Sequence, residues 1–279
     1  MLKIGIESVA YFGALDYEQG LKKAKEHGYD CVDYGEICVS NTPFYTYGDK
    51  EYIEYLNDVK SCADKYGIEF FQVHGSCPRT VDLKTYDKPS DNFIRQLKTC
   101  EKLGCKYLVI HPYTGDGTED AKIIYYKNVE MLLTLIPYAK EYGVVICLEN
   151  LPFRPLAISK ASTLKKLVSQ LDSDYVKICF DTGHANVIGE NIADTVLLLG
   201  KDLKVLHVHD NYGGADDRHY LPYHGSIDWE AFTDALNKIG YDGCLSLETV
   251  ISIKTPEPAR EQLQLGLSTL ARELAKKVN

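Results

Sequence analysis

The sequence of 279 residues has few of the features that mark membrane, nucleic-acid-binding or secreted proteins. No apolar run approaches the roughly 18–20 residues that span a bilayer. The N-terminus, MLKIGIESVA, has no basic region followed by an apolar stretch, so it does not read as a secretion signal. Basic residues are outnumbered, with 31 Lys and Arg against 40 Asp and Glu and a formal net charge of −9. This balance argues against binding to nucleic acid or to an anionic membrane surface.

Cysteine pairs and glycine-rich phosphate loops are also missing. The nine cysteines are odd in number and include no CxxC pair, so the spacing of a zinc finger is absent. Cys147 and Cys179 lie inside apolar runs, where they are expected to behave as small buried hydrophobic residues in a reducing cytoplasm. Neither GxGxxG nor GxxxxGK[ST] follows any predicted strand, and no linker of low complexity divides the chain.

Short apolar runs alternate along the chain with longer stretches of helical periodicity. Strands are predicted at residues 2–8, 30–36, 68–75, 105–112, 144–150, 176–184, 203–211 and 244–249. Helices are predicted at residues 17–27, 50–66, 91–103, 121–142, 162–171, 191–199, 228–238 and 257–276. Apolar strands alternating with helices are typical of a parallel sheet. Eight such units predict an α/β fold, a single (β/α)₈ TIM barrel over residues 1–279, with an open doubly wound sheet as the alternative.

Glycine marks six of the seven junctions between a predicted helix and the next strand: Gly28, Gly67, Gly104, Gly143, Gly200 and Gly240. It is the usual residue just past a helix end, where the backbone turns left-handed. This second regularity supports the count of eight units. The longest irregular stretches, 37–49 and 210–227, both follow strands, so in a barrel they belong to the catalytic face.

Histidines gather at the predicted strand ends. His27 is the exception, expected to be a solvated residue near the end of a helix. The other seven lie at the ends of strands three, four, six and seven or in the loop after strand seven: His74, His111, His184, His207, His209, His219 and His224. Those ends converge on the face where barrel enzymes keep their sites. His224 is the weakest candidate, suited either to substrate binding or to shaping the loop.

Carboxylates join the histidines at the same level. Glu149, Asp181 and Glu248 end strands five, six and eight, and Asp217 lies two residues before His219. So many acids and imidazoles in one mouth need cations, and a divalent metal ion takes both as ligands. Nitrogen-rich ligation suits Zn²⁺, whereas carboxylate-rich ligation suits Mn²⁺ or Mg²⁺. His207 and His209 are two apart on one strand, so both point to the same side and either could be a ligand.

Taken in order, several motifs resemble a known group: VHG at 73–75, IHP at 110–112, LEN at 148–150, FDTGH at 180–184, HVHDN at 207–211, DRH at 217–219, GSIDW at 225–229 and LET at 247–249. Together they resemble the xylose-isomerase-like TIM-barrel superfamily over nearly the whole chain. That superfamily contains sugar and sugar-phosphate isomerases and epimerases, and also the type IV apurinic (AP) endonucleases.

The isomerase and epimerase branch implies one metal ion and four ligands. By resemblance these are Glu149, Asp181, a strand-seven histidine and Glu248. His209 fits the HxH pattern of the ketose epimerases, and His207 fits the HxND pattern of the endonucleases. The resemblance makes Glu149 and Glu248 the acid/base pair and lets His184 contact the substrate.

The endonuclease branch implies three zinc ions. Its additional ligands match His74, His111, His184, Asp217 and His219, and every one of these residue types is present. A multinuclear zinc phosphodiesterase is therefore the alternative function. The two long loops argue against a DNA cradle, because residues 37–52 carry one Lys and no Arg, and residues 210–225 carry three Asp and one Arg.

These loops suit a small polar substrate better. Phe44, Tyr45 and Tyr47 could stack on a sugar. Arg218 and Arg154 could bind an anionic group, and Glu36 could receive a hydroxyl. We therefore predict a cytoplasmic, metal-dependent sugar, sugar-phosphate or sugar-acid isomerase or epimerase. Proton transfer would run through a metal-bound enediolate, with Glu149 and Glu248, three strands apart, on opposite sides of the mouth. A catalytically silent metal-binding barrel is a second alternative, and a homodimer or homotetramer is possible by resemblance.

Overall fold

Eight parallel strands form the centre of the molecule. The computed structural model describes residues 1–13, 15–78, 89–214, 216–249 and 251–278. The strands are β1 (Lys3–Glu7), β2 (Cys31–Tyr34), β3 (Glu69–His74), β4 (Tyr107–Ile110), β5 (Val145–Glu149), β6 (Val176–Asp181), β7 (Leu203–His207) and β8 (Cys244–Leu247). All eight predicted strands are confirmed, each somewhat shorter than its apolar run.

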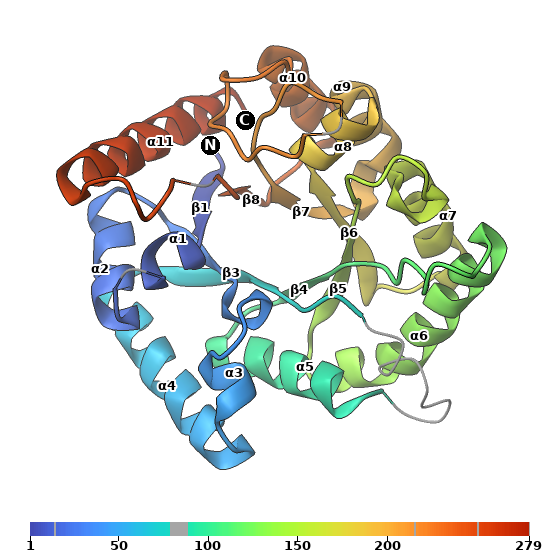
Figure 1. Cartoon of the computed structure of the whole chain (residues 1–279), viewed down its shortest axis with the longest axis horizontal. Helices are drawn as coiled ribbons and strands as arrows, with labels where there is room; N and C mark the ends of the chain where they lie inside the picture. The colour runs from blue at the N-terminus through green and yellow to red at the C-terminus, as the bar shows by residue number, and fades with distance from the viewer. Residues whose placement is uncertain (14, 79–88, 215, 250, 279) are drawn as a thin grey trace.

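The sheet closes on itself. Its strands follow the order β7-β6-β5-β4-β3-β2-β1-β8, with every neighbouring pair parallel. Just beyond β7, Val208 forms a parallel bridge with Leu247 of β8. The Val208 amide donates to the Ser246 carbonyl at 2.8 Å, and the Glu248 amide donates to the Val208 carbonyl at 3.1 Å. The fold is thus a (β/α)₈ barrel, and the open doubly wound alternative is wrong (Figure 1).

Helices surround the strands in an outer ring (Figure 1). The eight predicted helices are confirmed to within one residue at each end, as α2 (Tyr17–Glu26), α4 (Asp49–Tyr66), α5 (Asp91–Leu103), α6 (Ala121–Glu141), α7 (Ala161–Leu171), α9 (Ile192–Leu199), α10 (Trp229–Ile239) and α11 (Glu257–Lys277). The six junction glycines all have positive φ, as expected. No helix in the described ranges is long and apolar enough to cross a membrane.

Several short helices were not predicted. They are α1 (Val9–Phe12), α3 (Pro43–Thr46), α8 (Thr182–Ile188) and the single 3₁₀ turns η1 (Glu36–Cys38), η3 (Ala157–Ser159) and η4 (Gly200–Asp202). The prediction that strand six continues to residue 184 is wrong. The Asp181 carboxylate accepts a hydrogen bond from the His184 amide at 2.6 Å, which caps α8 and ends the strand.

The core has two layers. Apolar side chains that point outward from the strands pack against the helices and form the large cluster, which includes Ile146, Leu148 and Phe180. A smaller cluster joins Val109, Val145, Cys147, Cys179 and Val205. Because side chains alternate along a strand, the smaller cluster lies on the same side as the polar residues at the strand ends. It therefore fills the barrel beneath the mouth.

His27 differs from the prediction of a solvated residue. Its half-buried ring lies between α2 and α11, with Nδ1 2.7 Å from the Tyr11 hydroxyl and Nε2 3.0 Å from Glu261 Oε2. The ring joins the N-terminal and C-terminal parts of the helix layer. The pattern of helix α2 alone could not show this contact, because Glu261 is supplied by a distant part of the chain.

Candidate metal centre

Inward-facing positions at the carboxyl ends of the strands carry the candidate ligands. Glu149, Asp181 and His207 each follow a residue of the barrel-filling cluster by two positions, so they continue the same inward face. All three are fully buried. Glu248 follows the end of β8 and completes a group whose ligand atoms all lie within 4.8 Å of one another: Glu149, Asp181, His207 and Glu248.

His207 is the strand-seven histidine in this central group. Its Nδ1 lies 2.9 Å from Glu149 Oε1 and 3.1 Å from Glu248 Oε2. Glu149 and Glu248 come from well-separated strands, as predicted, yet their carboxylates meet at one ring nitrogen in the centre of the mouth. The resemblance left His207 and His209 as alternatives, and the geometry places His207 with the three carboxylates.

The opposite nitrogen of His207 contacts a residue that sequence reasoning missed. Its Nε2 lies 3.0 Å from Asp33 Oδ2, and the same oxygen accepts a hydrogen bond from Gln72 Nε2 at 2.8 Å. Asp33 and Gln72 are both buried inside the barrel. The available signal was an aspartate inside the apolar run CVDY, which is costly to bury without a partner.

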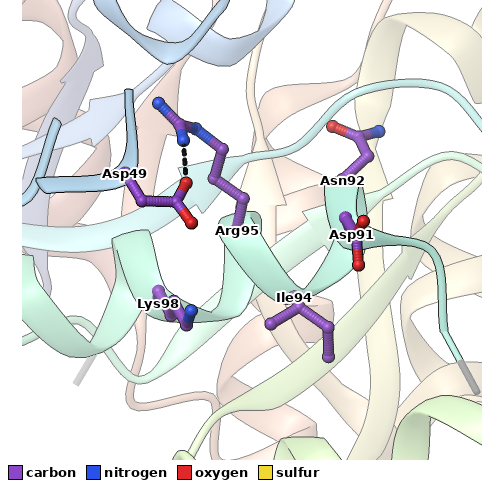
Figure 2. Close-up of a pocket in the computed structure, with 6 residues that line it drawn as sticks. All are labelled: Asp49, Asp91, Asn92, Ile94, Arg95 and Lys98. Carbon is purple, nitrogen blue, oxygen red and sulfur yellow. Dashed lines mark hydrogen bonds and ion pairs between the residues drawn. The ribbon is translucent and has the colours of Figure 1, made fainter. Parts of the chain in front are cut away.

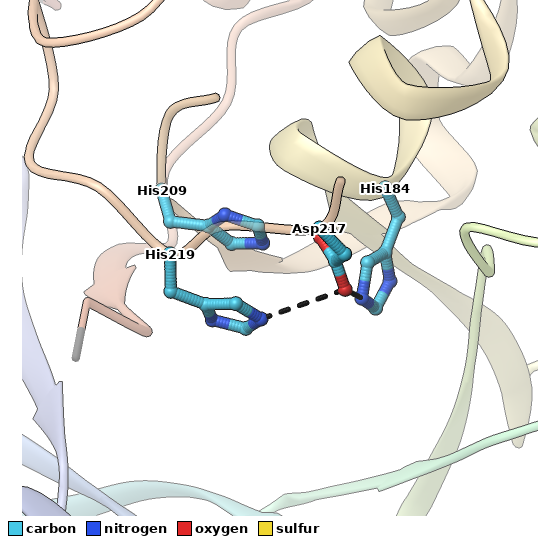
Figure 3. A group of neighbouring side chains, drawn as sticks. All are labelled: His184, His209, Asp217 and His219. Atoms are coloured by element: carbon cyan, nitrogen blue, oxygen red, sulfur yellow. Dashed lines mark ion pairs between the residues drawn. The ribbon is translucent and has the colours of Figure 1, made fainter. Parts of the chain in front are cut away.

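A second group lies beside the first and contains His184, His209, Asp217 and His219 (Figure 3). His184 Nε2 is 3.2 Å from Asp217 Oδ2, and His219 Nε2 is 3.7 Å from the same oxygen. The rings of His209 and His219 stack with centroids 3.8 Å apart. Thus His209 belongs here, although its Nε2 also lies 3.0 Å from Asp181 Oδ1.

A third group joins His74 and His111 to the other oxygen of Glu149. His111 Nε2 is 3.1 Å from Glu149 Oε2, and His74 Nε2 is 3.6 Å from it. Glu149 therefore faces His207 with Oε1 and these two imidazoles with Oε2. The structure brings together all the histidines and carboxylates that the sequence assigned to the metal site.

The charges of the centre are strongly coupled. Burial favours the protonated form of Glu149, but His207 and His111 outweigh it and hold its pKa well below the usual range. Burial disfavours protonation of His111, yet Glu149 raises its pKa to about 10. In the same way Asp181 and Asp217 outweigh burial and raise the pKa of His184 to about 9. The buried carboxylates are therefore stabilised in their ionised form by positive charge on the neighbouring imidazoles.

Several buried atoms at these positions have no hydrogen-bond partner within the described residues. They are both ring nitrogens of His74, Nδ1 of His209 and Oδ1 of Asp217. Buried polar atoms without partners are costly. Imidazole nitrogens and carboxylate oxygens at this separation are ligands for a divalent cation, so the residues present fit a metal ion.

The predicted substrate contacts are only partly brought to this mouth. Arg218 is exposed and pairs with Asp216 at 2.7 Å, whereas Arg154 Nε donates to the Val187 carbonyl at the end of α8. Phe44 is buried in the helix layer, so the prediction that it stacks on substrate is wrong. Its ring packs against Tyr52 instead.

Glu36 and the remaining loop candidates lie above the first two strands. Burial first, and Glu7 second, raise the pKa of Glu36 to about 7. Tyr45 is exposed, and its hydroxyl donates to the Ile37 carbonyl at 2.6 Å. Tyr47 packs edge-on against Tyr55. His224 Nδ1 lies 3.2 Å from the Pro222 carbonyl, which fits the interpretation that it shapes its loop.

A cavity of about 490 Å³ opens beside the third group. Its lining combines acids, imidazoles, thiols and one tyrosine: Glu7, Ile37, Cys38, Tyr45, His74, Ser76, Cys77, Asn92, His111 and Glu248. A second cavity of about 340 Å³ lies on the helix layer, where Arg95 pairs with Asp49 (Figure 2). The Arg95 guanidinium also lies 4.3 Å from the centre of the Tyr52 ring. We assign Arg95 a packing role.

Comparison with known proteins identifies the family of the chain. The family model described as xylose isomerase-like TIM barrel matches residues 21–270. An inosose isomerase from Bacillus velezensis is 27% identical over 245 residues, which cover 83% of this chain and 82% of that protein. A probable endonuclease 4 from Mycoplasmoides gallisepticum is 29% identical over 189 residues, covering 62% and 60%.

Solved structures show the same fold. D-psicose 3-epimerase from Clostridium cellulolyticum H10, solved with D-tagatose, superposes with a TM-score of 0.78 at 22% identity and covers 98% of this chain and 99% of its own. The IOLI protein with a bound zinc atom superposes with a TM-score of 0.74 at 20% identity, covering 98% and 96%. The chain belongs to the xylose isomerase-like TIM barrel family.

Proposed function

We propose that this chain is a divalent-metal-dependent isomerase or epimerase of a sugar or a closely related polyhydroxy ketone. The observation that carries the proposal is the central group. Glu149 and Glu248 meet at Nδ1 of His207, and the ligand atom of Asp181 lies within 4.8 Å of the other three. Relatives named as an inosose isomerase and a D-psicose 3-epimerase support this chemistry. The zinc atom in the IOLI structure supports a metal ion in this fold.

When bound, a divalent ion would polarise the oxygens of an α-hydroxy carbonyl and stabilise the negative charge that develops on them. Glu149, Asp181, His207 and Glu248 would hold it. The low pKa values of Glu149 and Glu248 keep both carboxylates ionised at neutral pH. This is the form that binds a cation and that accepts a proton.

Glu149 and Glu248 are proposed to move the proton. One carboxylate takes it from the carbon beside the carbonyl, and a carboxylate returns it to the neighbouring carbon or to the opposite face. The buried Asp33 holds His207 from below, which keeps the group ordered during the transfer. The backbone N–H of His184 donates a hydrogen bond to the Asp181 carboxylate, and the Asn150 carbonyl lies 2.8 Å from its Nδ1. These contacts position His184, which is proposed to contact the substrate.

The test is uptake of deuterium from D₂O into sugars. Ketohexoses and inososes are incubated with zinc- or manganese-loaded protein and followed by NMR. We expect exchange of one C–H in at least one substrate, abolished in Glu149→Gln and Glu248→Gln while both variants stay folded. Exposed Glu273→Gln is the matched control and should exchange like wild type. Full exchange in either active-site variant, or in chelated protein, would refute the mechanism.

A second candidate is a multinuclear zinc phosphodiesterase, favoured by one observation. In addition to the central group, His184, Asp217 and His219 meet in the second group, and His74 and His111 meet Glu149 in the third. The net charge of −9 does not favour a DNA substrate. Zinc-dependent cleavage of a model phosphodiester or of abasic DNA, without sugar exchange, would establish this candidate. Metal binding with neither activity would indicate a catalytically silent barrel.

A further inference from the structure

Cys77 lies at the mouth of the barrel, three residues beyond the end of β3. Its thiol is exposed and lines the cavity of about 490 Å³. Sγ lies 2.7 Å from His111 Nδ1. The other nitrogen of that ring, Nε2, lies 3.1 Å from Oε2 of the fully buried Glu149. A thiol that solvent can reach is therefore connected through one imidazole to the carboxylate shared by two of the three groups.

The same cavity is lined by a second imidazole, that of His74. His74 is only 4% exposed and lines this cavity, and neither of its ring nitrogens has a hydrogen-bond partner within the described ranges. Its Nε2 lies 3.6 Å from the same oxygen of Glu149 that His111 approaches. Two imidazoles thus converge on Glu149 Oε2, and Cys77 contacts one of them.

We propose that the Cys77 thiol controls how tightly the metal centre binds its ion and that small electrophiles can modify it. The partner of one imidazole nitrogen sets the tautomer and the angle of the ring, and so decides what the other nitrogen offers. Cys77 in this way positions His111, and His111 positions Glu149. Alkylation ends that contact: an S–C bond forms at Sγ, the thiol proton is released and the halide leaves. The added group also occupies the cavity.

This inference rests on the metal centre of the proposed function but not on its reaction. Cys38 is the other exposed thiol of the chain and lines the same cavity. It contacts main-chain carbonyls of His74 and Gly75, at 3.5 and 3.4 Å from Sγ. A Cys38→Ser background therefore leaves Cys77 as the single exposed thiol. The probe ion is zinc, measured as ions retained per chain.

Zinc-loaded Cys38→Ser protein is treated with iodoacetamide, desalted and analysed by elemental and peptide mass spectrometry. We expect zinc to be lost in proportion to alkylation of Cys77, while the Cys38→Ser/Cys77→Ser protein keeps its zinc under the same treatment. Without reagent, Cys77→Ala in this background should weaken zinc binding roughly 10–100-fold. Cys77→Ser should restore most of the affinity, because a hydroxyl still contacts Nδ1.

Complete alkylation of Cys77 with zinc retained would overturn the inference. Equal zinc affinity in the Cys77→Ala and Cys77→Ser variants would overturn it as well. Failure of the proposed function is read separately. If Cys77 alkylation releases zinc as expected but the protein exchanges no sugar proton, only the proposed reaction is refuted. If the wild-type protein binds no zinc, both the proposed function and the role of Cys77 are refuted.

Discussion

The buried contact between Asp33 and His207 predicts a large effect on metal affinity from a residue that lies outside the central group of Glu149, Asp181, His207 and Glu248. In the wild-type chain His207 Nε2 lies 3.0 Å from the Asp33 carboxylate. Asp33→Asn keeps the shape of the side chain but removes its charge, so this hydrogen bond is no longer charge-assisted. The amide can also turn its NH₂ group toward the ring, which would favour the wrong tautomer of His207 for binding a cation through Nδ1.

The size of the effect follows from the hydrogen bond. A hydrogen bond to a charged group contributes about 1.5–3 kcal/mol, and about 1.4 kcal/mol corresponds to a tenfold change in affinity. Asp33→Asn should therefore weaken zinc binding by roughly 10–100-fold, the range usual for partners that orient metal ligands. The contact is fully buried, so solvent screening does not reduce the estimate.

Competition with a chromophoric chelator measures this affinity directly. Asp174→Asn is the matched control, because Asp174 is exposed and far from the mouth, on the loop before β6. It should bind zinc like wild type, and circular dichroism should show both variants folded. A folded Asp33→Asn protein with wild-type zinc affinity would refute the view that Asp33 positions His207.

Two further predictions concern protons and packing. In the metal-free chain Glu149 raises the pKa of His111 to about 10, and Asp181 raises that of His184 to about 9, against the effect of burial. Both rings border the proposed ligands, and a cation bound by the neighbouring carboxylates would disfavour the protonated form of each ring. Binding should therefore release protons and tighten as pH rises from about 6 to 9, which calorimetry in two buffers tests; pH-independent binding would contradict it. In Gly183→Ala the new Cβ would lie 1.9 Å from His209 Cε1, so His209 must leave its stack on His219. Overpacking of this kind costs about 1–3 kcal/mol, and thermal unfolding should show it. The control is Gly266→Ala, where nothing lies within 4 Å and the helix should be unharmed. An unchanged Tm and zinc affinity in Gly183→Ala would refute this packing.

Local patterns were enough to predict the barrel and most of the residues in the candidate metal centre. Apolar runs bounded by glycine specify strand and helix, and eight repeats leave a closed barrel as the simple solution. Because a parallel barrel gathers the ends of its strands, residues such as His111, Glu149 and Asp181 could be placed in one mouth before any geometry was known.

Contacts between distant parts of the chain could not be read in this way. The cap that Asp181 places on α8 ends β6 early, although the apolar pattern runs on. Asp33 contacts His207 across the interior of the barrel, and Cys77 meets His111 across two neighbouring loops. Phe44 turns into the helix layer, although the neighbouring aromatic residues Tyr45 and Tyr47 of the same loop are exposed. Each depends on tertiary packing that no window of the sequence contains.

The metal content of the native chain tests the central claim most directly. Protein purified without chelator and without a histidine tag is analysed by elemental mass spectrometry. The proposed isomerase or epimerase predicts about one tightly held zinc or manganese ion per chain, which is lost when Glu149 or Glu248 is replaced by Gln. Protein that holds no divalent ion and takes up none when it is supplied would contradict the account, and three tightly held zinc ions would favour phosphodiester hydrolysis instead.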